Sequence, residues 1–208
     1  MKSVCVLVFT ALLAGVVMVS PANAIPTLYF SEGSYLADLG LLGVGTIFEG
    51  FEGSDWNGVR YPSSEPIVTS QGLSWLGLSD SVTTNSGSIW VHSGEYGVFE
   101  DWGDPDGLGV IYGSETMYGF GGWIATSSAT EVSYYLDGSL AGTLYAGTWA
   151  YPSFFGVIDS DGFQTVRMVT PEGHFGGDDF TVGVVPEPIT LLLLGSGLFG
   201  LGIFRRRK

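Results

Sequence analysis

Thr130-Glu-Val-Ser-Tyr-Tyr-Leu136 and Ser139-Leu-Ala-Gly-Thr-Leu144 are two runs with the composition of β-strands, and only Asp137-Gly138 separates them. β-Branched and aromatic residues fit the pleated, half-buried surface of a strand. Asp-Gly between two such runs favours a two-residue turn in which both residues take positive φ. The stretch therefore predicts a β-hairpin.

The same pattern continues outward from this hairpin in both directions. Short apolar or alternating runs recur between Gly, Asp, Ser and Pro residues, without a convincing helical period. The predicted strands are Thr46–Phe51, Ile67–Thr69, Leu73–Gly77, Ile89–His92, Gly97–Phe99, Gly109–Tyr112, Met117–Ala125, Thr130–Leu136, Ser139–Ala146, Phe154–Ile158, Gln164–Thr170 and Asp179–Val184. One weak helix is predicted at Ser34–Leu42. Many short strands separated by turn residues predict an all-β domain, an antiparallel β-sandwich or jelly roll.

The C-terminal region has a different character and three parts. A rigid motif is followed by an uninterrupted apolar run, Ile189–Phe204, and then by four cations; the motif is Pro186, Glu187, Pro188 and the cations are Arg205, Arg206, Arg207, Lys208. Each proline disfavours helix at the residue before it, so the motif is an extended, accessible peptide. Sixteen helical residues span about 24 Å, which is short of the roughly 30 Å hydrocarbon core. Because the terminal cations can reach the headgroups, the run predicts a single transmembrane helix with its basic end in the cytoplasm.

This arrangement resembles the PEP-CTERM sorting signal of Gram-negative bacteria that make exopolysaccharide. Such tails are also labelled as the C-terminal domain of an ice-binding protein, although the flat Thr-rich repeat that ice binding requires is not evident here. The resemblance implies that an exosortase, a membrane cysteine protease, recognises Pro186–Pro188 and removes the tail. It also implies export across the inner membrane to the cell surface or matrix, with exopolysaccharide as a partner. A permanent single-span anchor is the alternative.

The N-terminal region has the features of a second targeting signal. Lys2 precedes an apolar run, Val4–Val19, and Ala22-Asn23-Ala24 forms a small-x-small cleavage site for signal peptidase. We therefore divide the chain into a signal peptide at residues 1–24, an exported domain at 25–185 and the sorting signal at 186–208. A retained N-terminal membrane helix is the alternative. The single cysteine, Cys5, lies in the leader, so the exported domain can form no disulfide.

The exported domain is strongly acidic. It keeps only Arg60 and Arg167 among the basic residues and 20 of the 21 acids, which gives a formal charge of −18 against −14 for the whole chain. The electrostatic field of such a negative charge disfavours binding to nucleic acid and to anionic membrane surfaces. Neutral polysaccharide and divalent cations are compatible with it. A region of this length is sufficient for one domain with a substantial core.

A second resemblance concerns the region from about Phe48 to Val184. Its alternation of aromatic residues and glycine resembles the cargo region of many PEP-CTERM proteins, a sandwich similar to carbohydrate-binding jelly rolls. The segments that carry it are Tyr118–Trp123, Tyr134–Leu144, Phe154–Asp159, Phe163–Arg167 and Asp178–Val182. The resemblance implies carbohydrate binding, and it implies that Phe163–Val169 and Asp179–Val182 are neighbouring strands.

Two sets of acids are candidate Ca²⁺ ligands, because Ca²⁺ prefers six to eight oxygens. The first set is Asp101, Asp104 and Asp106 in the loop Glu100–Gly107. Its spacing departs from the EF-hand pattern, and Asp and Gly are also ordinary turn formers. The second set follows from the jelly-roll resemblance, which implies a structural Ca²⁺ between the terminal strands; its ligands would be Glu52 with Asp178 or Asp179.

Enzyme activity has little support in the sequence. A glycosidase needs two carboxyls about 5–10 Å apart, and no feature selects a pair among the many acids. His92 and His174 are isolated, and no Gly-x-Ser-x-Gly motif is present. We predict a non-catalytic protein. An exported polysaccharide hydrolase and a Ca²⁺-dependent adhesion module are the alternatives.

Tryptophan is abundant and offers a second kind of candidate site, because exposed indole rings can stack on sugars. Most of the six tryptophans are expected in the core or at the rim of a sandwich. Trp56 and Trp102 lie in acidic loops beside Asp55 and Asp101, so we predict that these two are exposed and form a ligand-binding surface.

Overall fold

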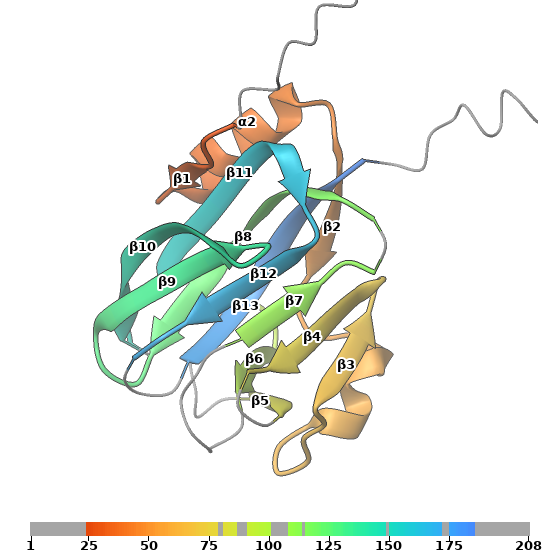
Figure 1. Ribbon diagram of the computed structural model, residues 1–208. Coiled ribbons are helices and arrows are strands. Elements are labelled where there is room, and N and C mark those ends of the chain that lie inside the picture. Colours follow the sequence, from red (N-terminus) through yellow and green to blue (C-terminus); the bar gives the residue numbers. More distant parts are fainter. Residues whose placement is uncertain are drawn as a thin grey trace, which may run out of the picture.

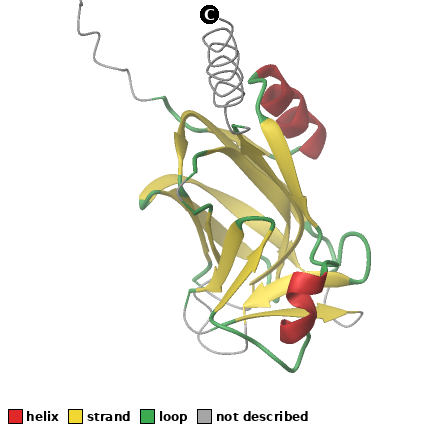
Figure 2. Ribbon diagram, turned by 90° about the vertical axis from the view of Figure 1, so that its right-hand side faces the viewer, coloured by secondary structure: helices red, strands yellow, loops and turns green. Residues whose placement is uncertain are grey.

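The computed structural model describes residues 24–78, 81–86, 91–100, 108–113, 115–148, 150–171 and 175–185 of the 208-residue chain. Its strands form two sheets that enclose one core, with helices at the periphery (Figures 1 and 2). This arrangement confirms the predicted all-β sandwich. No helix in the described ranges has the length and apolar character that crossing a bilayer requires. The predicted transmembrane helix at 189–204 lies outside those ranges, as do the first 23 residues of the predicted signal peptide.

Seven strands form the first sheet, which we call sheet A. Strand β13 lies at its centre, between β8 on one side and both β2 and β6 on the other. The order continues from β8 through β11 to β1, and from β6 to β5. The bounds are β1 Thr27–Tyr29, β2 Gly45–Glu49, β5 Val82–Ser86, β6 Tyr96–Glu100, β8 Met117–Thr126, β11 Ser153–Phe163 and β13 Phe175–Val184.

Six strands form the second sheet, sheet B, in the order β3, β4, β7, β12, β9, β10. Their bounds are β3 Ile67–Ser70, β4 Leu73–Gly77, β7 Leu108–Ile111, β9 Thr130–Leu136, β10 Ser139–Thr148 and β12 Thr165–Val169. The end of β10 also pairs with β8 in parallel, at Gly147 and Thr148, and this pairing links the two sheets. The other pairings between these strands are antiparallel.

The register of sheet A places five strands in one row. Thr27 pairs with Ile158, Ile158 with Gly119, Gly119 with Gly183, and Gly183 with Thr46. Residues that precede Thr27 and residues that follow Gly183 therefore lie toward the same end of the sheet.

Helix α2 (Glu32–Leu41) packs on sheet A through two buried side chains, Tyr35 and Leu39. The Tyr35 hydroxyl donates a hydrogen bond of 2.8 Å to the carbonyl oxygen of Thr181. The helix can lie this close because the sheet presents glycines below it: a Cβ at Gly183 would contact the Leu39 side chain. The helix stops before Gly43, whose φ of 68° suits a helix C-terminus.

The centre of the sandwich is a cluster of aromatic rings. The Phe51 ring lies 4.9 Å from the Trp56 ring and 5.0 Å from the Trp75 ring, each at an angle typical of edge-to-face contacts. Phe120 and Phe180 pack beside Trp75. The cluster joins residues of both sheets, and a short 3₁₀ helix, η1 (Ser54–Val59), carries Trp56 into it.

Most predicted strands are present with shifted ends, and the predicted helix Ser34–Leu42 corresponds to α2. The hairpin is confirmed: Asp137 and Gly138 have φ of 47° and 82°, both positive as the turn requires. Strands β1 and β5 were not predicted. The predicted strand Ile89–His92 falls partly outside the described residues, and His92 itself is not in a strand. The prediction that Phe163–Val169 and Asp179–Val182 are neighbours is wrong, because β12 lies in sheet B and β13 in sheet A.

Candidate functional site

An open groove of about 690 Å³ lies at the N-terminal end of α2, where β8, β10 and β11 meet it. Aromatic side chains provide much of its lining, and a carboxylate and a hydroxyl accompany them. The lining includes Phe30, Glu32, Trp123, Tyr145, Ser153 and Phe154. Sugar recognition uses such a combination, because rings stack on pyranose faces while polar groups bond to hydroxyls.

Two rings of this groove are exposed but held in place. Tyr145 is 67% exposed, and its hydroxyl donates to the carbonyl oxygen of Ala129 at 3.1 Å. Phe30 is 66% exposed and contacts the buried Phe155 ring edge-to-face at 5.9 Å. An aromatic ring fixed in this way loses little conformational entropy when a ligand stacks on it.

Trp123 is held by contacts on more than one side. The His92 ring is stacked on it, with centroids 4.1 Å apart and planes 11° apart. Phe154 contacts the Trp123 ring edge-to-face at 5.8 Å. His92 is itself fixed, because its Nδ1 lies 2.6 Å from Oδ2 of Asp179. A chain of contacts therefore runs from β13 through His92 to the wall of the groove.

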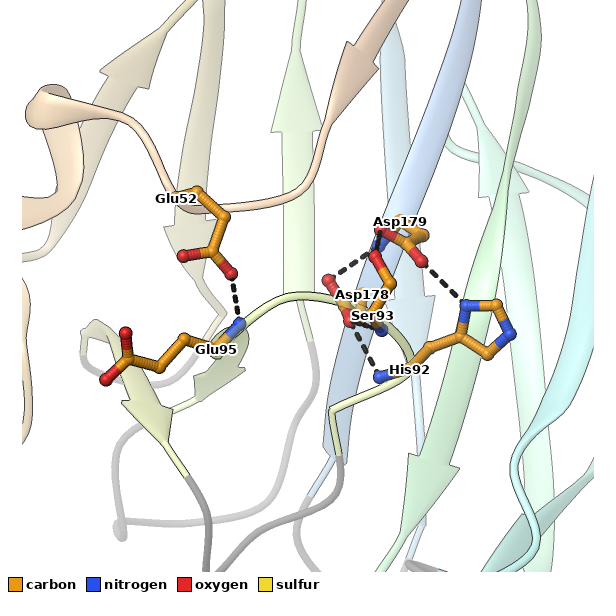
Figure 3. Close-up of polar contacts among 6 residues, drawn as sticks. All are labelled: Glu52, His92, Ser93, Glu95, Asp178 and Asp179. Carbon is orange, nitrogen blue, oxygen red and sulfur yellow. Dashed lines mark hydrogen bonds and ion pairs between the residues drawn. The ribbon is translucent and has the colours of Figure 1, made fainter.

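The series of contacts begins at a β-bulge in β13, which carries two acidic residues. Asp178 is opposite Trp123, whereas Thr181 is opposite Gly121, so β13 has one more residue here than β8. Asp179 takes a φ of 50°, as residues at bulges often do. As a result the two consecutive carboxylates, Asp178 and Asp179, both contact the segment His92–Ser93 (Figure 3).

The segment His92–Tyr96, which we call the carboxylate-held loop, is bound at both ends. At one end Asp178 Oδ2 accepts the backbone N–H groups of His92 and Ser93 at 2.7 and 3.0 Å. At the other end Glu52 Oε1 accepts the N–H groups of Glu95 and Tyr96 at 2.5 and 2.9 Å. Figure 3 shows Glu52 beside Glu95 at one end of the loop and the two aspartates beside His92 and Ser93 at the other end.

Asp178 is fully buried, and its titration reflects this. Burial raises the pKa of its carboxyl from 3.8 to about 7, and the neighbouring Asp179 charge also raises it. The backbone N–H groups of Ser93, Asp179 and His92 act in the opposite direction, because they favour the ionised form. Desolvation is the larger effect.

The arrangement of Ser93, His92 and Asp179 differs from a catalytic triad. In a triad the histidine lies between the serine and the carboxylate, so that it can accept the serine proton. Here the carboxylate lies in the middle: Asp179 Oδ1 accepts from Ser93 Oγ at 2.8 Å, and Oδ2 contacts His92. These contacts hold the loop in place, and the acceptor of the Ser93 hydroxyl is the carboxylate and not the histidine.

The predicted Ca²⁺ ligands fall into two groups. Asp101, Asp104 and Asp106 lie outside the described residues. Glu52, Asp178 and Asp179 do converge on one loop, but there they accept hydrogen bonds from it. Within the described ranges no three His, Cys, Asp or Glu side chains are arranged to hold a metal ion. Calcium binding by this protein stays a prediction.

Of the two predicted binding tryptophans, Trp102 also lies outside the described residues. The prediction that Trp56 is exposed is wrong, because its side chain is 0% exposed. Its acidic neighbours indicated a surface loop, but η1 turns the indole inward onto Phe51 and Trp75 while Asp55 faces solvent.

The groove residues were not predicted from the sequence, although one signal was present. Along β10, Leu144 and Ala146 are buried and Tyr145 between them is exposed. Because successive side chains of a strand point to opposite faces, a large aromatic residue at an outward position indicates a surface role. Phe30 and Trp123 gave no comparable local signal, since tertiary contacts bring them together.

Comparison with known proteins identifies the C-terminal region. Residues 184–208 match the family model of the PEP-CTERM protein-sorting motif, which includes Pro186, Glu187, Pro188 and the basic end. The chain thus carries a PEP-CTERM sorting signal, as predicted, and this signal indicates export and membrane-associated sorting. No curated protein matches the sequence.

Several solved structures are similar to the described fold at a low level. One contains the CBM51-2 and INT domains of Clostridium perfringens ZmpB in complex with GlcNAc, with 16% identity, a TM-score of 0.37, and coverage of 54% of this chain and 30% of that chain. Another is TmCBM61 in complex with β-1,4-galactotriose, at 17% identity and a TM-score of 0.35, covering 64% and 92%. A third is CsCBM6-3 from Clostridium stercorarium in complex with cellobiose. Its sequence identity is 16% and its TM-score 0.31, and the match covers 62% of this chain and 92% of that chain. Similarity at these TM-scores assigns no ligand or site.

Proposed function

We propose that this is an exported, non-catalytic protein that binds neutral polysaccharide in the groove beside α2, at the cell surface or in the extracellular matrix. The observation that carries the proposal is the pair of fixed, exposed rings, Phe30 and Tyr145, in one groove with Trp123. Export rests on the sorting signal at 184–208. Removal of that signal by an exosortase is part of the proposal.

The polar groups of the groove fit the same ligand. Between the rings, the Glu32 carboxylate can accept hydrogen bonds from sugar hydroxyls, and the Ser153 hydroxyl can both donate to them and accept from them. The chain carries a formal charge of −14, so a polyanionic polymer would be repelled. A neutral or weakly charged glycan has apolar faces for the rings and hydroxyls for the carboxylate.

The test is binding of the purified full chain to a panel of neutral polysaccharides, with Tyr145→Ala as the principal variant. Removal of one stacking ring costs on the order of 1–2 kcal/mol, so we expect affinity to fall about 5–30-fold. Tyr61→Ala is the matched control, because Tyr61 is also an exposed tyrosine but lies in the turn after η1, away from the groove. Equal affinities of the two variants would remove the groove from the proposal.

The same assay separates the two alternatives. Release of new reducing ends from a bound polysaccharide would identify a hydrolase. Loss of binding on chelation would favour a Ca²⁺-dependent adhesion module and would direct attention to Asp101, Asp104 and Asp106. Binding that survives chelation, without release of reducing ends, is the result expected for a non-catalytic module.

A further inference from the structure

Four exposed apolar side chains lie at the end of the domain from which the C-terminal region continues. Leu41 is 84% exposed at the last turn of α2, and the neighbouring Leu42 is also exposed. Ile25 is 89% exposed, and Val185 is exposed at the last described position. Isolated exposed apolar residues are ordinary, but four on one end of an acidic domain form a distinct surface.

Strand register places these four residues together. Val184 pairs with Gly45, which follows Leu42 by three residues, so the end of α2 lies beside the end of β13. The row through Thr27 and Gly183 places the residues before Thr27 at this same end. Figure 1 shows α2, the start of β2 and the end of β13 at one end of the molecule. We call Ile25, Leu41, Leu42 and Val185 the apolar end.

The length of chain beyond Val185 identifies what can cover this surface. Three residues, Pro186–Pro188, separate Val185 from the apolar run Ile189–Phe204. Even when fully extended, they allow about 14 Å between the Cα atoms of Val185 and Ile189. While the sorting signal is in a membrane, the domain therefore cannot move its β13 end away from the bilayer.

We propose that the apolar end docks in the interfacial region of the membrane as long as the sorting signal is attached. The inference rests on the membrane-associated sorting that residues 184–208 indicate, and it is independent of glycan binding. Leucine and isoleucine side chains gain free energy when they leave water for the headgroup–acyl boundary. Docking would orient the domain with α2 rising from the bilayer.

This orientation determines where the groove lies. Tyr35 contacts the sheet at Thr181 and Leu39 contacts it at Gly183, so α2 runs from the groove toward the apolar end. A helix of 10 residues spans about 15 Å. The groove at its N-terminal end is therefore held clear of the headgroups and open to the outside.

Zwitterionic vesicles are the appropriate membrane for a test. Asp161 lies at the apolar end, where it accepts the backbone N–H of Ala24 at 2.7 Å, and anionic lipid would repel it. The chain that signal peptidase would leave, residues 25–208, contains no cysteine and would be reconstituted in phosphatidylcholine vesicles and recovered by flotation. A single labelling site, Leu42→Cys, would carry an environment-sensitive NBD fluorophore, and shallow spin-labelled phosphatidylcholine would act as quencher.

Two comparisons decide the outcome. Ile67→Cys is the matched control, because Ile67 is an exposed apolar residue on β3 in sheet B. We expect quenching about threefold or more stronger at position 42 than at position 67, because only the former is within the interface. Adding Leu41→Gln to the Leu42→Cys chain should reduce that quenching by about half, since it removes buried apolar area.

Each failure has a separate meaning. A chain that does not float with the vesicles would overturn the premise that the sorting signal enters the membrane. Equal quenching at positions 42 and 67 in a chain that floats would overturn docking. Quenching at position 42 that is unchanged by Leu41→Gln would show that the short connection alone holds this end near the lipid, and would also overturn docking. None of these results bears on the groove, whose test uses soluble polysaccharide.

Discussion

Asp178 is an acidic residue in an environment that disfavours its ionised form. It is fully buried beside a second carboxylate, and burial raises its pKa from 3.8 to about 7. Between these pH values the folded state retains a proton that the unfolded state has released. The contribution of this group to stability is therefore fully present below about pH 3.8 and is lost as the pH rises through 7.

Replacing Asp178 with Asn tests this effect, because the variant keeps the side-chain shape and cannot ionise. Between pH 5 and pH 8 we expect Asp178→Asn to gain roughly 1–3 kcal/mol in free energy of unfolding relative to the parent chain. Urea unfolding followed by tryptophan fluorescence at both pH values measures the difference. Asp55→Asn, at an exposed aspartate, is the control for losing one carboxylate. A difference for Asp178→Asn that is the same at both pH values would contradict the assignment.

Single residues were the level at which the sequence was least informative. Trp56 has acidic neighbours and is buried, whereas Tyr145 has apolar neighbours and is exposed. Local composition therefore predicted, incorrectly, that the Trp56 side chain is exposed. The outward position of Tyr145 was not predicted, although alternation along its strand contained it, because alternation reports which face a side chain occupies. Contacts such as that of His92 with Trp123 join segments distant in sequence, and no local pattern contains them.

At the level of elements, the carboxylate-held loop depends on side chains from two other parts of the chain. Glu52 accepts two of its backbone N–H groups. We expect Glu52→Ala to speed amide hydrogen exchange at Glu95 and Tyr96 by about tenfold to a hundredfold, because hydrogen bonds to a charged acceptor contribute on the order of 1.5–3 kcal/mol. Exchange measured by NMR or mass spectrometry provides the comparison.

The control for this loop is Glu131→Ala, which removes an exposed glutamate from β9. It should leave exchange at Glu95 and Tyr96 unchanged. Unchanged exchange in Glu52→Ala as well would mean that Asp178 and Asp179 hold the loop without help from Glu52.

Elements were predicted well where local chemistry determines them. Asp137-Gly138 requires no tertiary information to turn, and the flanking strands pair antiparallel, with one irregularity between Leu140 and Gly142. Strands β1 and β5 were missed because they are short and gain their order from pairing with β11 and β6. The bulge at Asp179 could not be predicted either, since it is defined by a mismatch with β8. The acidic pair was identified from the sequence, but its hydrogen-bonding role depends on that mismatch.

At the level of the whole molecule, the two predicted processing events define the mature chain. Mass spectrometry of the protein isolated from its own host should find an N-terminus at Ile25 and a C-terminus near Pro186–Pro188. Signal peptidase and exosortase would generate these ends. A C-terminus that retains Arg205–Lys208 would instead indicate a permanent anchor, and an N-terminus at Met1 would indicate a retained leader.

The row of strands across sheet A has a mechanical consequence. The chain leaves the sheet at Val185, whereas Trp123 and the groove lie further along the same strands toward the opposite end. A force pulling on the groove against a fixed Val185 would act lengthwise along β8 and β13. Their ladder hydrogen bonds would then be loaded in shear, many at once, instead of being opened one after another. Under such a pull, sheet A would resist through several hydrogen bonds loaded together.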